Sequence, residues 1–124
     1  MATTLKPDGQ KLLRILIPYL DTVTIRGDVV LGCPTYTEVL QKLLPHWKPT
    51  HGDYVGRMIK SRGLDDLAEW ATENGFPNIT GLIVSKGPPS QPGEGYFNVI
   101  YKTQIPTWAE NIQQAKIFDW SPYI

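Results

Sequence analysis

Residues 78–102 read NITGLIVSKGPPSQPGEGYFNVIYK, and this stretch decides how the rest of the chain is interpreted. The runs ITGLIVSK and YFNVIYK contain β-branched and aromatic residues that suit a pleated strand. Between them lies GPPSQPGEG, which has too much proline and glycine to form a helix or a strand ladder. The stretch therefore predicts two strands joined by a long loop, as in the wing of a winged helix-turn-helix domain.

The N-terminal part of the chain predicts a helix followed by a small β-structure. Asp8 can cap this helix, whose apolar residues recur at helical spacing: Leu12, Leu13, Leu16 and Ile17. Pro18 ends or kinks it. Residues 22–31, TVTIRGDVVL, contain two short β-rich runs around the triplet RGD and predict a hairpin or an extended pair. RGD also occurs in adhesion ligands, but in a chain without a secretion signal we interpret it as turn chemistry.

Three helical patterns precede the predicted hairpin. Thr35 and Glu38 form a capping box for a helix over residues 36–44. The second pattern covers residues 53–61, and the third covers residues 64–74 with Gly75 as its stop signal. The fold class expected from this order is α+β, a single winged helix-turn-helix-like domain.

A last helix begins at a second capping box, Thr107 and Glu110, and continues to about residue 118. The aromatic tail after it, DWSPYI, is expected to pack back over the domain; a partner-binding patch is the alternative. The whole chain, 1–124, is expected to be one domain. Its parts are an N-terminal helix with short strands (1–33), a helical core (34–76), the hairpin (77–103) and the C-terminal helix and tail (104–124).

Composition limits the classes of partner. The chain has 124 residues, with 12 Lys+Arg and 12 Asp+Glu, so no global field draws it to nucleic acid or to an acidic membrane, and any anion binding must be local. A single cysteine, Cys33, excludes an internal disulfide and fits a reducing compartment. Without a signal peptide or an apolar run of about 18 residues, the chain is expected to be cytoplasmic and not bound to a membrane.

The best local basic cluster lies at the end of the second central helix. Arg57 and Lys60 are one turn apart, and Arg62 follows in the next turn. A short basic helix behind a helix and a turn is where a helix-turn-helix protein places its reading surface. With Tyr36 and Lys86, these residues are the predicted nucleic-acid-binding set. Lys6, Lys11 and Arg14 lie off the apolar stripe of the first helix and are interpreted as a solvated face.

An acidic stripe in the third helix disfavours binding of nucleic acid, in contrast to the basic cluster. Asp66, Glu69 and Glu73 line up along it and would repel a phosphate backbone. This helix should therefore face away from DNA, or the domain serves a protein partner.

No catalytic residue, metal site or cofactor is predicted. His46 and His51 lie in one turn, but a tetrahedral zinc site needs three or four ligands, and the nearest extra candidates are Asp53 and the distant Cys33. We interpret the two histidines as loop residues.

Several short motifs occur in the order seen in one family. PTYTEV (34–39), VGRM (55–58), Pro77, LIV (82–84) and Gly-Tyr (95–96) resemble the DNA-binding domain of alkylguanine-DNA alkyltransferases and alkyltransferase-like proteins. In that family a Thr-Tyr-Gly-Glu helix start precedes a recognition helix with Val-Gly, and Pro-Cys-His-Arg-Val-Val and Gly-Tyr follow. The resemblance implies a winged-helix scaffold, with Tyr36 and Arg57 near a phosphate backbone.

The departures from this family concern its chemistry. After Pro77 the chain has Asn78-Ile79-Thr80-Gly81 in place of Cys-His-Arg, so the alkyl-accepting thiolate and its histidine are absent. Cys33 lies far from that position in the sequence. Asp53 stands where the family has its intercalating arginine. The resemblance therefore implies binding rather than alkyl transfer.

The leading hypothesis is a non-catalytic nucleic-acid-binding protein that uses the basic helix and the loop over residues 87–95 as a wing. The alternative is a small protein-interaction module, such as a phage or mobile-element inhibitor or adaptor. Zero net charge, the acidic stripe and the aromatic C-terminus favour the alternative. A third hypothesis, an enzyme centred on His46 and His51, has the least support.

Overall fold

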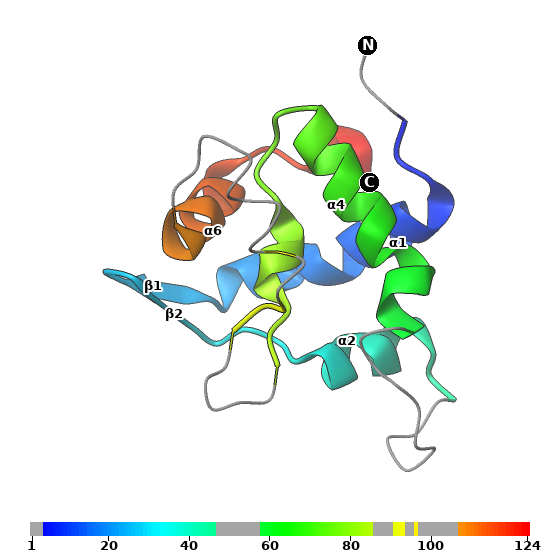
Figure 1. Ribbon diagram of the computed structural model, residues 1–124, viewed down its shortest axis with the longest axis horizontal. Coiled ribbons are helices and arrows are strands. Elements are labelled where there is room, and N and C mark those ends of the chain that lie inside the picture. Colours follow the sequence, from blue (N-terminus) through cyan, green and yellow to red (C-terminus); the bar gives the residue numbers. More distant parts are fainter. Residues whose placement is uncertain (1–3, 47–57, 86–90, 94–95, 97–106) are drawn as a thin grey trace.

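The N-terminal helix α1 (Pro7–Leu16) is the element against which most of the others pack. In the computed structural model, which describes residues 4–46, 58–85, 91–93, 96 and 107–124, α1 crosses the molecule and leads towards the β-hairpin (Figure 1). Its buried face consists of Gly9, Leu12, Leu13 and Leu16, which recur at helical spacing. The predicted helix is confirmed, and its apolar stripe is the centre of the core.

The start of α1 differs from the prediction. Pro7 is the first helical residue, Lys6 occupies the N-cap position, and no side chain caps the helix. Asp8 lies inside the first turn, so its predicted role as the cap is wrong. Proline suits the first helical position because it has no N–H to leave unsatisfied and its φ is already helical. Pro18 lies where α1 gives way to the 3₁₀ helix η1 (Ile17–Asp21), as expected from its missing N–H.

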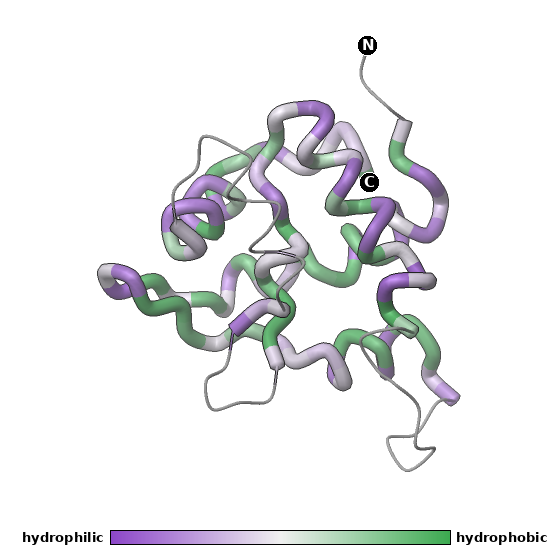
Figure 2. The backbone as a smooth tube through the Cα atoms, viewed as in Figure 1, coloured by the Kyte–Doolittle hydropathy of each residue, from purple (hydrophilic) through white to green (hydrophobic). Residues whose placement is uncertain are grey.

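A two-stranded antiparallel sheet follows. β1 (Thr24–Arg26) pairs with β2 (Val29–Leu31), with Ile25 opposite Val30 on the inner face. Figure 2 shows that the strands of this hairpin are hydrophobic and that its turn is hydrophilic. Gly27 in the turn has φ +59°, which glycine adopts without strain. The predicted hairpin is confirmed, and the fold class is α+β.

The helices after the hairpin mostly follow their predicted limits. They are α2 (Tyr36–Leu43), α4 (Asp65–Glu73) and α6 (Trp108–Ile117). Thr35 Oγ1 accepts a hydrogen bond from the Glu38 N–H at 3.2 Å, and Thr107 Oγ1 accepts one from the Glu110 N–H at 3.1 Å. Both predicted N-caps are therefore confirmed. Gly75 has φ +70° just after α4, as its predicted role as a stop signal requires.

The predicted first strand of the wing is wrong. Ile79–Leu82 form a 3₁₀ helix, η4, and Val84 makes only an isolated parallel bridge with Thr35. All four residues of η4 are buried, so the segment has no solvent-facing side of the kind that an alternating strand presents. Of the predicted second strand, Tyr96 alone is described, and residues 97–102 lie outside the described part of the chain.

Asn78 and Asn111 explain why this segment turns. Asn78 Oδ1 accepts a hydrogen bond from the Thr80 N–H at 3.3 Å, which caps η4. Asn111 on α6 accepts from the Asn78 N–H at 3.0 Å and donates to the Asn78 carbonyl at 2.9 Å. It also donates to the Tyr96 hydroxyl. These bonds occupy the backbone groups that a neighbouring strand would otherwise need.

The C-terminal tail packs on the domain, as predicted. Trp120 is 4% exposed, and its indole N–H donates to the Ala115 carbonyl at 2.9 Å. Its ring belongs to a cluster of aromatic side chains in mutual contact: Trp70, Phe76, Phe118, Trp120 and Tyr123. Trp120 is therefore part of the core and not of an exposed face. Within the described residues, no helix is both long enough and apolar enough to cross a bilayer.

Candidate nucleic-acid interface

Most of the predicted basic helix over residues 53–61 lies outside the described residues, and its described end leads into an irregular turn. Met58 and Ile59 are helical, and Lys60–Leu64 form the π-type turn η3, with Ile59 and Gly63 buried. Lys60, Ser61 and Arg62 between them are exposed. Burial of the residues on either side fixes the turn on the core, and the two cations are presented to solvent.

A backbone kink at Arg62 and Gly63, inside η3, changes the direction of the chain before α4 begins. Arg62 has φ −104° and ψ 22°, and Gly63 has φ +119°. A Cβ at Gly63 would overlap the backbone carbonyl of Asp8 in α1, so only glycine allows the two segments to approach so closely. The contact between Gly63 and Asp8 therefore sets where η3 lies on α1.

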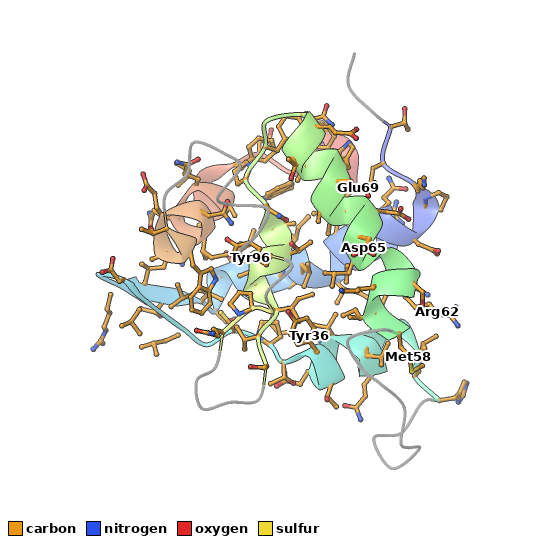
Figure 3. All side chains as sticks on the ribbon, viewed as in Figure 1. Tyr36, Met58, Arg62, Asp65, Glu69 and Tyr96 are labelled. Atoms are coloured by element: carbon orange, nitrogen blue, oxygen red, sulfur yellow. The ribbon has the colours of Figure 1, made fainter. Side chains whose placement is uncertain are left out.

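The structure separates the predicted site residues into two groups. Lys60 and Arg62 lie together on η3, whereas Tyr36 begins α2; Figure 3 shows Tyr36 well apart from Arg62. Arg57 and Lys86 lie outside the described residues. The described part of the chain therefore brings two of the five predicted contacts together.

Tyr36 has a structural role. Its hydroxyl accepts a hydrogen bond from the Gly93 N–H at 2.8 Å, and the Ser85 N–H donates to the Gln91 carbonyl at 2.9 Å. Together these bonds fix both ends of the segment between Ser85 and Gly93 beside the start of α2. Burial raises the pKa of Tyr36, and the hydrogen bond from Gly93 opposes that effect. The hydroxyl is therefore uncharged at neutral pH and does not repel an anion.

The acidic residues follow η3 along α4. Asp65 and Glu69 are exposed, and Figure 3 shows Arg62, Asp65 and Glu69 in succession along this part of the chain. Asp66 makes an ion pair with Lys6 at 3.5 Å, an exposed contact that contributes about 0–1 kcal/mol. The change of charge thus occurs at the kink, where the basic turn ends and the acidic helix begins.

The sequence pattern did not indicate the buried polar group around Asn78. Asn78, Thr80 and Asn111 are all at least nine-tenths buried, and Thr80 Oγ1 donates to Asn78 Oδ1 at 2.5 Å. Tyr96 packs its ring against Gly81, where a Cβ would lie 2.5 Å from the ring. Burial raises the pKa of Tyr96, so its hydroxyl keeps its proton. The group acts as a structural connection between η4 and α6.

The described side chains that could bind a metal ion or act as a nucleophile do not form a cluster. Among the residues that the structure describes, no three His, Cys, Asp or Glu side chains lie close enough together to hold a metal ion. His46 is exposed, while His51 and Asp53 lie outside the described ranges. Burial raises the pKa of Cys33 to about 11, so its thiol is protonated at neutral pH and is a poor nucleophile.

Comparisons of the chain with protein-family models, with curated proteins and with solved structures found no match. The resemblance to alkyltransferase DNA-binding domains therefore stays a hypothesis.

Proposed function

We propose that this chain is a non-catalytic nucleic-acid-binding protein whose phosphate contacts are made by η3. The observation that carries the proposal is the exposure of Lys60 and Arg62 on one turn whose flanking residues Ile59 and Gly63 are buried. Cationic side chains bind phosphates most effectively when their backbone is already held in place, because less conformational entropy is lost on binding. Arg57, Tyr36 and Lys86 are the further contacts that the proposal includes.

The zero net charge of the chain supports a local contact rather than a general attraction. Each phosphate that a lysine or arginine neutralises releases counterions, and the logarithm of the binding constant then changes by about 0.9 for each tenfold change in salt concentration. A surface with a few such contacts binds weakly at physiological salt and more tightly at low salt.

A winged helix-turn-helix arrangement is the finer part of this proposal. In it, α2 is the supporting helix and the basic segment that ends in η3 is the reading helix. The loop over residues 87–95 would act as a wing without the first predicted strand, since that segment is the 3₁₀ helix η4. Tyr36, through its bond with Gly93, ties one side of this loop to α2.

Fluorescence anisotropy with short duplex and single-stranded DNA tests the proposal. Binding should weaken between about 50 mM and about 200 mM salt, and the double substitution Lys60→Ala with Arg62→Ala should weaken it further. Arg26→Ala is the matched control for Arg62→Ala, because Arg26 is also an exposed arginine but lies on the hairpin. Absence of binding at low salt, or equal loss in the two single arginine variants, would refute the proposal.

The hairpin favours a second candidate function, a protein-interaction module. Val29 and Leu31 are 53% and 47% exposed, and in the strand register they lie opposite Arg26 and Thr24 on the outer face. Exposed apolar side chains on one strand are a common feature of protein-binding edges. A stoichiometric protein recovered with the wild-type chain but lost with Val29→Thr and Leu31→Thr would support this candidate. Recovery of nucleic acid with no such protein would count against it.

A further inference from the structure

We propose that the nucleic-acid surface continues from η3 onto α1 and α2, through Lys11, Arg14 and Lys42. This inference rests on the proposed function and extends it to cations that the sequence pattern assigned to a solvated face or did not single out. The ligand is the phosphate backbone of a nucleic acid.

Packing around α1 brings together three elements that carry exposed cations. On one side, Gly63 of η3 lies against the Asp8 carbonyl of α1. On another, Lys11 Nζ lies 3.5 Å from the Leu43 carbonyl of α2. η3 and α2 therefore both pack beside α1. In the proposed surface, their exposed cations border the solvent face of this helix.

The exposed side of α1 carries two of these charges. Lys11 and Arg14 are three residues apart, which places them on one face of a helix, opposite the buried Leu12, Leu13 and Leu16. A ten-residue helix is about 15 Å long, and that length corresponds to about four base-pair steps of a duplex. The helix is therefore long enough to follow several phosphates.

Lys42 completes the cluster in the last turn of α2. Its ammonium group lies 4.5 Å from the centre of the Tyr19 ring, a cation–π distance. The carbonyls at the C-terminus of a helix carry partial negative charge, and Lys11 lies against one of them. The Lys11 ammonium group therefore offsets the negative end of α2.

In the part of the chain that the structure describes, the five cations have no carboxylate partner. Within the described ranges, none of Lys11, Arg14, Lys42, Lys60 and Arg62 lies within ion-pair distance of an acidic side chain. The acidic residues that border the cluster in sequence are Asp8, Glu38 and Asp65. A group of unpaired cations on three packed elements is complementary in charge to a phosphate backbone.

The test compares two double variants with the same change in net charge. Lys11→Ala with Arg14→Ala removes two cations of the proposed surface. Arg26→Ala with Lys116→Ala removes two exposed cations on the hairpin and on α6 and is the control. All are solvent-exposed positions, and a urea unfolding curve for each variant checks that the fold is retained.

Each lost phosphate contact should weaken binding about eightfold at about 0.1 M salt. It should also reduce, by about 0.9, the slope of the logarithm of the binding constant against the logarithm of the salt concentration. The double variant on α1 should therefore lose affinity several tens of times, whereas the control should change little. The Lys42→Gln variant should bind nucleic acid about eightfold more weakly, because it too loses one phosphate contact.

The outcomes separate this inference from the proposed function. If the wild-type chain binds no nucleic acid at low salt, the proposed function fails. If it binds and responds to substitutions at Lys60 and Arg62, but the α1 double variant behaves like the control, only the inference fails. Vesicles of anionic lipid are the second probe, and a chain that binds them more tightly than nucleic acid would overturn the choice of ligand.

Discussion

Replacing Gly63 with alanine tests how η3 is held on α1. Two costs arise from the structure. The φ angle of +119° lies in a region that L-residues with a side chain seldom adopt, which costs about 1–3 kcal/mol. In addition, the new Cβ would overlap the Asp8 carbonyl, and because that atom belongs to the backbone, α1 or η3 must move. The free energy of unfolding should fall by about 3 kcal/mol or more.

Gly75→Ala is the matched control for this prediction. Gly75 also has a positive φ, +70°, but a Cβ there would meet nothing within 4 Å. Its replacement should cost only the conformational strain, about 1–2 kcal/mol. The difference between the two variants therefore measures the contact between Gly63 and Asp8.

Urea unfolding followed by tryptophan fluorescence measures both variants, because Trp70 and Trp120 are buried in the folded chain. If Gly63→Ala costs no more than Gly75→Ala, the close approach of η3 to α1 is wrong. A folded Gly63→Ala variant should also bind nucleic acid more weakly than Gly75→Ala, because a shift of η3 moves Lys60 and Arg62.

Three further predictions concern the core, the thiol and a helix cap. Asn111→Ala should reduce the free energy of unfolding by about 3 kcal/mol in urea, because it removes three buried hydrogen bonds, those to the N–H and carbonyl of Asn78 and to the Tyr96 hydroxyl; a loss below about 1 kcal/mol would contradict that network. Because burial raises the pKa of Cys33 from 9.0 to about 11, its thiol should react with a disulfide reagent about 100-fold more slowly at about pH 8 than a free cysteine does. The rate should keep rising with pH above 9.0, and a plateau there would show an ordinary thiol. Thr107→Ala should cost about 1 kcal/mol in thermal or urea unfolding, because the Glu110 N–H loses its acceptor; an unchanged stability would mean that the cap contributes nothing.

Local signals were the part of the fold that the sequence predicted well. The capping residues Thr35 and Thr107, the hairpin turn at Gly27 and the stop at Gly75 all behave as expected. Each of these features is determined by hydrogen bonds or φ angles within a few residues. Their physical causes are therefore contained in a short window of sequence.

For residues 79–84, a short window of sequence predicts the wrong secondary structure. Its β-branched residues favour a strand, but β-propensity mainly reflects packing against neighbours. Here the neighbours are Asn111, 33 residues after Asn78, and the Tyr96 ring against Gly81. The bonds from α6 to Asn78 and the complete burial of η4 favour a 3₁₀ turn over a ladder. Neither contact follows from the spacing of residues within the segment itself.

The candidate site also has one part that a short window of sequence predicts and one part that depends on packing. Exposure of Lys60 and Arg62 follows from a local pattern of apolar and charged residues. The nearness of Lys11 and Lys42 to them, which we propose, depends on how α1 packs against η3 and α2. A search of the sequence for runs of basic residues finds a positive surface only when one segment supplies all of its cations. In the surface that we propose, α1, α2 and η3 each supply one or two cations.

The positive surface that we propose therefore depends on uncharged residues. Gly63 allows η3 to reach α1, and the leucines on the buried face of α1 fix the helix on which Lys11 and Arg14 lie. Because the cations lie on separate elements, their mutual spacing is retained only while these contacts hold. It follows that affinity for a phosphate backbone and stability of the α1–η3 contact should change together, even in a variant that alters no charge. On this proposal, a chain with zero net charge attracts a phosphate backbone locally, because packing brings together cations that are far apart in its sequence.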